Sequence, residues 1–215
     1  SYFQEHEEED HSKTLVCLMF VNNETGVFQD PDVFGAIAHE NGALMFCDAI
    51  QAAGRMALNF DEMNFDVMTI SAHKFGGPKG VGAVVIAPGI EVTPLMRGGG
   101  QEMKRRPGTE NVSGIAGFGK AAELAPSTYN QWAALEELRN ALEEGMIPQN
   151  GARLPNTLWF ATPGLTAEQQ VIALDIAGIS VSAGSACSSG KMTPSETLLA
   201  MGLGKDLAAS AIRVS

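Results

Sequence analysis

The sequence predicts an α/β fold in which helices are layered against a β-sheet that is parallel at least in part. Several short segments are apolar without polar alternation, which is typical of strands buried on both faces of such a sheet. Between the first two, residues 32–40 carry apolar side chains at helical spacing, and Asn41-Gly42 follows as a helix stop. Strands that alternate with a helix favour this layered architecture. The expected strands are residues 15–21, 43–47, 67–70 and 81–86.

The later part of the chain is predicted to begin with helices and to continue into a smaller α+β unit. Residues 111–144 show Ala-rich and Leu-rich helical periodicity, which is interrupted at Pro126-Ser127. We place the domain boundary at that break, so the first domain covers residues 1–126 and the C-terminal domain residues 127–215. In the C-terminal domain the patterns predict strands at 156–160 and 180–182, and helices at 167–177 and 193–201.

Composition excludes several classes of function. The 215 residues are 45% hydrophobic and 18% charged, so the chain can bury a core and does not have the composition of a disordered protein. Its formal net charge of −11 disfavours binding to nucleic acid or to an anionic membrane surface. No apolar stretch approaches the ~18 residues that a membrane span requires. The acidic run at residues 5–10 is interpreted as a solvated surface segment or a loose end.

The cysteines indicate a reducing compartment, and we expect a cytoplasmic protein. Three cysteines do not build a disulfide framework. Cys17 and Cys47 lie in apolar segments and are expected to be core thiols, whereas Cys187 lies in a run of small residues after a predicted strand. Its thiol is therefore expected to be accessible, either as a reactive nucleophile or as an incidental surface thiol. No pair of Cys or His has metal-ligand spacing, so no metal site is expected.

Polar side chains follow directly after two of the predicted strands, at the edge where open α/β sheets bind ligands. Asp48 follows one strand, and Lys74 follows another and precedes a glycine-rich turn. A lysine in apolar surroundings can form an imine with a carbonyl compound, and a carboxylate can pair with a pyridinium nitrogen. Gln51 could share the site of Asp48. The alternatives are a surface lysine and a helix-capping aspartate.

Glycine-rich segments at residues 98–102 and 105–111 offer backbone amides, hydroxyls and guanidinium groups. Such groups bind phosphate, although either segment could equally be a tight turn. Neither matches the P-loop.

Six of these motifs stand in one order along the chain. They are Asn22-Asn23-Glu24-Thr25-Gly26, Cys47-Asp48-Ala49-Ile50-Gln51, Ser71-Ala72-His73-Lys74, Gly98-Gly99-Gly100-Gln101-Glu102, Gly108-Thr109-Glu110-Asn111 and Ser185-Ala186-Cys187-Ser188-Ser189. In order and spacing they resemble the cysteine desulfurases, pyridoxal-phosphate enzymes of the class V aminotransferase group. The resemblance implies an aspartate-aminotransferase-like fold: a mostly parallel sheet in a partial large domain, and a small α+β C-terminal domain.

The resemblance implies roles for particular residues. Lys74 would hold pyridoxal 5'-phosphate covalently and move the substrate α-proton. Asp48 would pair with the pyridinium nitrogen, and Gln51 would hydrogen-bond the ring hydroxyl. Cys187 would take the sulfur of L-cysteine, which leaves L-alanine and a persulfide on the enzyme.

Other residues would bind the phosphate and the substrate carboxylate. Ser71 and His73 would bind the phosphate, and Thr109 would reach the phosphate of the neighbouring subunit, since the family is homodimeric. Asn23 and Arg213 would hold the carboxylate. The long form of the loop around Cys187 resembles the subgroup that supplies iron–sulfur scaffold proteins, so such a scaffold or another sulfur acceptor is the expected partner.

By the same resemblance, part of the family's chain is expected to be missing. Ahead of Thr14 we expect the family's segment with the ring-stacking histidine and a phosphate-binding turn to be missing, and after Ser215 its final helices, and residues 144–153 look short. The leading hypothesis is a cysteine desulfurase. The alternatives are another reaction on the same fold, such as selenocysteine lyase or amino transfer, and a non-catalytic fragment that only dimerises or binds a partner.

Overall fold

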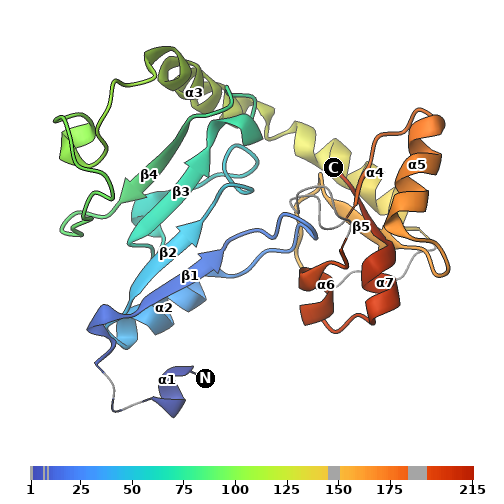
Figure 1. The fold of residues 1–215 in the computed structure, drawn as a ribbon, viewed down its shortest axis with the longest axis horizontal. Coiled ribbons are helices and arrows are strands. Elements are labelled where there is room, and N and C mark those ends of the chain that lie inside the picture. The colour runs from blue at the N-terminus through green and yellow to red at the C-terminus, as the bar shows by residue number, and fades with distance from the viewer. Residues whose placement is uncertain (1, 7, 9, 145–150, 184–192) are drawn as a thin grey trace. The chain divides into compact units, whose positions relative to one another are not determined.

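The computed structural model describes residues 2–6, 8, 10–144, 151–183 and 193–215 (Figure 1). The chain divides into two compact units. Unit 1 comprises Ser1–Val21 and Gln29–Tyr129, and unit 2 comprises Asn22–Phe28 and Asn130–Ser215. No described helix combines the length and apolar character that a membrane span requires.

Unit 1 is built on a four-stranded sheet whose strands run in chain order: β1 (Leu15–Met19), β2 (Leu44–Asp48), β3 (Val67–Ser71) and β4 (Gly82–Ile86). The β1–β2 and β2–β3 pairs are parallel and β3–β4 is antiparallel, which confirms the predicted mostly parallel α/β sheet. Helix α2 (Pro31–Glu40) makes the crossover from β1 to β2 and packs on both strands. The other elements are α1 (Tyr2–Glu5), α3 (Val112–Leu124) and the 3₁₀ turns η1 (His11–Lys13), η2 (Phe60–Glu62), η3 (Ala72–Lys74), η4 (Glu102–Lys104) and η5 (Ala125–Thr128).

The two faces of this sheet are buried to different extents, and this overturns one expectation. Met45 and Cys47 on β2 are fully buried, as expected, and burial raises the pKa of the Cys47 thiol to about 12. Cys17 was expected to be a core thiol, but it is exposed together with Leu15 and Met19 on the same face of β1. Among the described strands β1 is an edge strand, and only one of its two faces is covered. An apolar run therefore does not distinguish a strand buried on both faces from one buried on a single face.

Unit 2 is a three-stranded antiparallel sheet with helices, in line with the predicted α+β unit. Its strands lie in the order β5 (Leu158–Ala161), β7 (Ala211–Val214), β6 (Ser182–Ala183). Its helices are α4 (Gln131–Glu143), α5 (Ala167–Ile176), α6 (Glu196–Ala200) and α7 (Lys205–Ser210). A capping box between Thr166 and Gln169 begins α5. Leu198, Ala208 and Ala211 form the buried core on which Trp159 packs.

Residues 22–28 belong to unit 2 although the sequence prediction placed them within residues 1–126. Val27 forms a β-bridge with Arg153, and the amide of Phe28 donates to the carbonyl of Ala152 at 2.9 Å. The amide of Leu154 donates to the carbonyl of Gly26 at 2.9 Å. These contacts lie far apart in the sequence, so the local pattern of residues 22–28 carried no sign of them.

Helix α4 is joined to the same region by a buried ion pair. Arg153 donates from Nη1 and Nη2 to the two carboxylate oxygens of Glu143, at 2.5 and 2.8 Å. The side chains are 6% and 17% exposed, so the pair is largely removed from water. Arg139 on the same helix donates to the carbonyl of Leu154 at 3.1 Å. The hydrogen bonds from Arg153 hold the pKa of Glu143 below its ordinary value of 4.5.

We expect Glu143→Gln to lower the free energy of unfolding by about 3 kcal/mol, because it removes the carboxylate that pairs with the largely buried Arg153 guanidinium. Urea unfolding at pH 7 measures this, with Glu137→Gln on an exposed position of α4 as the control. Since folding depresses the pKa of Glu143, the stabilisation is present above pH 4.5 and is lost as the pH falls through the folded value. Equal unfolding free energies for the two variants would contradict the prediction.

Candidate active site

Lys74 lies at the end of a tightly turned segment that follows β3. The amides of Phe75 and Gly77 donate to the carbonyl of Ala72, at 3.1 and 2.9 Å. Gly76 has a φ of +88°, and a Cβ on Gly77 would stand 2.7 Å from the Cβ of Ala72. The turn therefore requires its glycines, and it fixes the backbone from which the half-buried Lys74 side chain extends.

The turn after β2 packs directly against the residue that follows Lys74. Gly54 has a φ of +76°, and a Cβ at this position would lie 2.2 Å from the Cβ of Phe75. The ring of Phe75 in turn packs 5.6 Å from that of Phe118 on α3. This close approach brings the segment after Asp48 against the segment that carries Lys74.

Asp48 occupies the carboxyl end of β2, beside β3 in parallel register. It pairs with Thr69, and the amide of Ala49 donates to the carbonyl of Thr69 at 3.0 Å. Its Oδ1 accepts a hydrogen bond of 2.9 Å from the amide of Ile50. One carboxylate oxygen thus closes a turn, and not the start of a helix as the capping alternative expected, in a side chain that is only half-buried. Asp48 and Lys74 follow neighbouring parallel strands at one sheet edge, where the sequence placed them.

Gln51 is held by a residue that the sequence reasoning missed. Nη1 of Arg55 donates to the side-chain oxygen of Gln51 at 2.9 Å and to its backbone carbonyl at 2.6 Å. The predicted contact between Gln51 and a cofactor hydroxyl remains a prediction. The i, i+4 spacing of glutamine and arginine was the available signal.

The two residues predicted to bind phosphate contact one another. Ser71 Oγ and His73 Nδ1 share a hydrogen bond of 2.8 Å. Ser71 ends β3 and His73 lies in η3, so both precede Lys74 by no more than a single turn.

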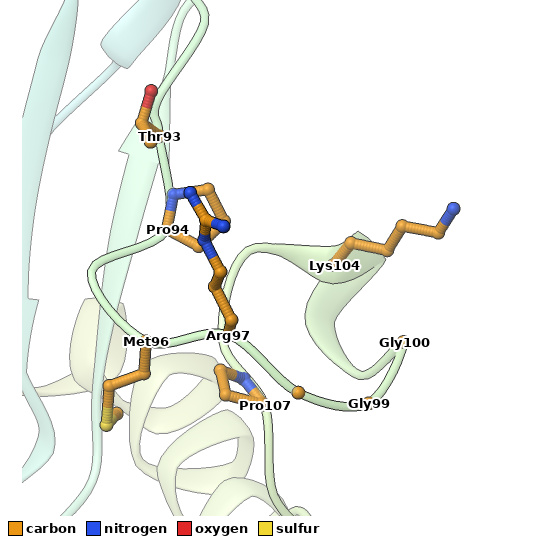
Figure 2. A pocket seen from close by; sticks show the side chains of 9 residues that line it. Thr93, Pro94, Met96, Arg97, Gly99, Gly100, Lys104 and Pro107 are labelled. Carbon is orange, nitrogen blue, oxygen red and sulfur yellow. The ribbon is translucent and has the colours of Figure 1, made fainter.

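The glycine-rich segment between β4 and α3 contains a cavity of about 260 Å³, lined by Thr93, Pro94, Met96, Arg97, Gly98, Gly99, Gly100, Lys104 and Pro107 (Figure 2). The Lys104 side chain points away from the cavity in this view (Figure 2). Thr109 follows this segment and is exposed. The cavity therefore does not present a converging set of cations.

Strain and exposed apolar side chains coincide in that segment. Glu102, Met103 and Lys104 have φ values of 48°, 54° and 67°, a left-handed conformation that costs roughly 1–2 kcal/mol per residue outside glycine. Leu95 is 99% exposed and Met103 is 82% exposed. Strained backbone of this kind clusters at active sites, ligand clamps and switch regions.

In unit 2, Arg213 and Asn23 lie together, and their expected role in binding the substrate carboxylate stays a prediction. Arg213 stands on β7, and its Nη1 donates to the carbonyl of Asn23 at 2.8 Å. Its Nε is buried and has no hydrogen-bond partner among the described residues. A buried, charged donor without a partner is costly, so this atom is suited to an anionic ligand.

Cys187 lies within residues 184–192, outside the described residues. Its predicted role therefore stays a prediction. In the described part of the chain, no group of three His, Cys, Asp or Glu could hold a metal ion.

The donor set of unit 1 fits pyridoxal phosphate. A carboxylate suits a protonated ring nitrogen, a lysine amine suits an aldehyde, and a hydroxyl–imidazole pair suits a phosphate. Asp48, Lys74 and the Ser71–His73 pair supply these groups from the ends of two adjacent parallel strands. These side chains therefore match the functional groups of pyridoxal phosphate in their chemistry and in their order along the chain.

The sequence profile described as "Aminotransferase class-V" matches residues 4–215. The chain belongs to the class-V aminotransferase family. Members of this family depend on pyridoxal phosphate. A cysteine desulfurase of Gluconacetobacter diazotrophicus is 40% identical over 211 residues, which cover 94% of this chain and 53% of that protein. A protein of Clostridium botulinum named "Cysteine desulfurase IscS" is 40% identical over 213 residues, which cover 94% of this chain and 54% of its own.

Among solved structures, the NifS-like protein of Rickettsia africae superposes with a TM-score of 0.88 at 35% identity. The match covers 100% of this chain and 59% of that one. The fold is therefore that of the NifS-like proteins. The chain spans about half the length of the curated relatives it matches.

Proposed function

We propose that this chain carries the catalytic residues of a pyridoxal-phosphate-dependent cysteine desulfurase, which converts L-cysteine to L-alanine and transfers the sulfur to an enzyme cysteine. The observation that carries the proposal is the placement of Asp48 and Lys74 after neighbouring parallel strands, in a chain 40% identical to proteins named cysteine desulfurase. The similarity to cysteine desulfurases indicates which reaction to expect, and Asp48 and Lys74 at the strand ends supply functional groups that this reaction requires.

Pyridoxal phosphate, when bound, supplies an electron sink for charge that develops at the substrate α-carbon. The Asp48 carboxylate would stabilise a proton on the ring nitrogen of the bound cofactor, because opposite charges favour the protonated form. Lys74 Nζ takes the α-proton and returns it, acting as the general base and acid. Ser71 Oγ and the His73 imidazole, which contact one another, would hold the phosphate of the bound cofactor.

Arg213 and Asn23 hold the substrate carboxylate, for which a guanidinium is better suited than an ammonium. The Cys187 thiolate attacks the substrate Sγ. The new S–S bond forms a persulfide as the substrate Cβ–Sγ bond breaks, and the electron pair of that bond remains with the carbon. That carbon is then protonated to give L-alanine, so the step needs no external oxidant or reductant.

The proposal is tested by incubating the pyridoxal-phosphate-treated chain with L-cysteine and measuring L-alanine together with protein persulfide. We expect the two products in equal amounts in the first turnover. Pyruvate or a keto acid without persulfide would indicate another reaction on this fold. Absence of all products would favour a non-catalytic chain.

We expect Arg213→Lys to raise KM for L-cysteine about 10–100-fold, the effect of one charge-assisted hydrogen bond. Cysteamine, which is cysteine without its carboxylate, serves as the matched substrate. Its turnover by the variant is expected to equal that by the wild type. A similar loss with both substrates would contradict a role for Arg213 in carboxylate binding.

We also propose that the active protein is a homodimer in which the segment between β4 and α3 contacts the second copy and carries Thr109 to its phosphate site. The exposed Leu95 and Met103 and the left-handed turn at residues 102–104 support this assignment. An iron–sulfur scaffold protein or another acceptor would then take the persulfide sulfur.

A further inference from the structure

The Asn22–Gly26 turn is held closed by its own side chains. Oδ1 of Asn22 accepts from the amides of Glu24 and Thr25, at 2.9 and 3.0 Å, and from the Thr25 hydroxyl at 3.2 Å. The amide of Gly26 donates to the carbonyl of Asn22 at 2.8 Å. Thr25 is only 1% exposed. The turn is therefore a rigid body whose orientation depends on its outside contacts.

Glu24 provides one of those outside contacts. Its Oε2 accepts a hydrogen bond of 2.5 Å from the hydroxyl of Ser195, and its Oε1 accepts one of 3.3 Å from Thr197. Ser195 is 1% exposed and caps α6, since its oxygen also accepts from the amide of Leu198 at 3.1 Å. A charged acceptor with two hydroxyl donors, one of them fully buried, is a strong and specific attachment.

The neighbouring residue on the turn provides a second contact, in addition to the hydrogen bond from the amide of Leu154 to the carbonyl of Gly26. The carbonyl of Asn23 accepts from Nη1 of Arg213, whose Nε stays buried without a partner among the described residues. The direction of the guanidinium therefore depends on where the Asn23 carbonyl stands. That position is set by a rigid turn whose next residue, Glu24, is fastened to α6.

We infer that Glu24 is a positioning residue for the amino-acid substrate. Its carboxylate fastens the Asn22–Gly26 turn to α6, and this holds the Asn23 carbonyl where it orients the Arg213 guanidinium for the substrate carboxylate. The inference rests on the proposed function, because it takes Arg213 as the residue that receives that carboxylate. Glu24 itself does not touch the substrate.

The described residues on either side of the segment that carries Cys187 contact β7 and Glu24. Before it, Ser182 and Ala183 of β6 pair with Arg213 and Ile212 of β7. After it, Ser195 begins α6 at the Glu24 carboxylate. Glu24 thus links the carboxylate-binding arginine to the helix that follows the sulfur-accepting cysteine.

The test uses the pyridoxal-phosphate-loaded chain and two amines that differ only in a carboxylate, L-alanine and ethylamine. Their dissociation constants are measured from the change in cofactor absorbance. We expect Glu24→Gln to raise the constant for L-alanine roughly tenfold, as for one weakened charge-assisted hydrogen bond. The constant for ethylamine should stay within about twofold.

Glu196→Gln is the matched control, because Glu196 is an exposed glutamate on α6, the helix to which Glu24 is hydrogen-bonded, and the substitution removes the same charge. It should leave both constants unchanged. Thr197→Val removes the weaker hydrogen bond to Glu24 without changing the side-chain volume much. It should raise the dissociation constant for L-alanine by about two- to threefold. The Glu24→Gln/Ser195→Ala double variant should bind L-alanine no more weakly than the weaker-binding of the two single variants. Both substitutions act through the one hydrogen bond between Ser195 and Glu24.

If Glu24 had a purely structural role, its variants would weaken the binding of both amines equally or of neither. Either pattern in Glu24→Gln and Thr197→Val would overturn the inference. A wild-type chain that gives no absorbance change with either amine would instead overturn the proposed function, and the inference with it. The two failures are therefore distinguishable by the wild-type control alone.

Discussion

Replacing Cys187 by alanine is expected to abolish persulfide formation and reduce L-alanine production from L-cysteine to background. A carbon side chain cannot accept the substrate sulfur, so the Cβ–Sγ bond has no nucleophile to assist its cleavage. Covalent binding of the cofactor at Lys74 should be unaffected. The measurement is L-alanine release together with persulfide labelling of the protein.

Cys17→Ala is the matched control, because Cys17 is the exposed cysteine of the described chain. It should keep full desulfurase activity. Buried Cys47 is unsuitable as a nucleophile, since burial raises its pKa to about 12 and leaves almost no thiolate at neutral pH. Persulfide found on Cys17, or undiminished L-alanine from Cys187→Ala, would refute the assignment of Cys187.

The second large effect is expected from Lys74→Ala. It should lower L-alanine formation by roughly 10²–10⁴-fold, the range for a positioned general base, and should remove the covalent link to the cofactor. Phosphate binding through Ser71 and His73 should persist, so the variant is expected to bind the cofactor reversibly. Activity and cofactor retention after gel filtration measure both effects.

Lys79→Ala provides the comparison, since Lys79 is exposed and lies on the same glycine-rich turn. It should match the wild type in both measurements. Equal losses in the two variants would show that the turn, and not the Lys74 amine, was disturbed.

Much of unit 1 could be predicted because its signals are local. An apolar run ending in Asp48, and another ending before Lys74, indicate strands whose carboxyl ends meet at one edge of a parallel sheet. The structure places both residues at that edge. The buried Cys47 followed from the same pattern.

What could not be predicted depends on contacts between distant parts of the chain. Cys17 lies in as apolar a run as Cys47, but the exposed face of an edge strand is a property of the sheet. The hydrogen bonds from Ser195 and Thr197 to Glu24 join residues more than 170 positions apart, so no local sequence pattern indicates them. The assignment of residues 22–28 to unit 2 has the same origin.

The roles of the site residues rest on family resemblance more than on geometry. Lysine after a strand is commonly a surface residue, and Asp48 does close a turn through its Oδ1. The buried Nε of Arg213, which has no partner in the described residues, was not visible in the sequence and adds an independent reason to expect an anionic ligand.

The proposed chemistry depends on Lys74 as the residue that holds pyridoxal phosphate, and reductive trapping shows whether it does. The purified chain is incubated with pyridoxal phosphate, reduced with borohydride, digested and mapped by mass spectrometry. We predict a stable pyridoxyl-phosphate adduct on Lys74, with Lys79 and Lys120 unmodified at the same cofactor concentration. A folded chain in which Lys74 stays unmodified, or in which all three lysines react equally, would contradict the account.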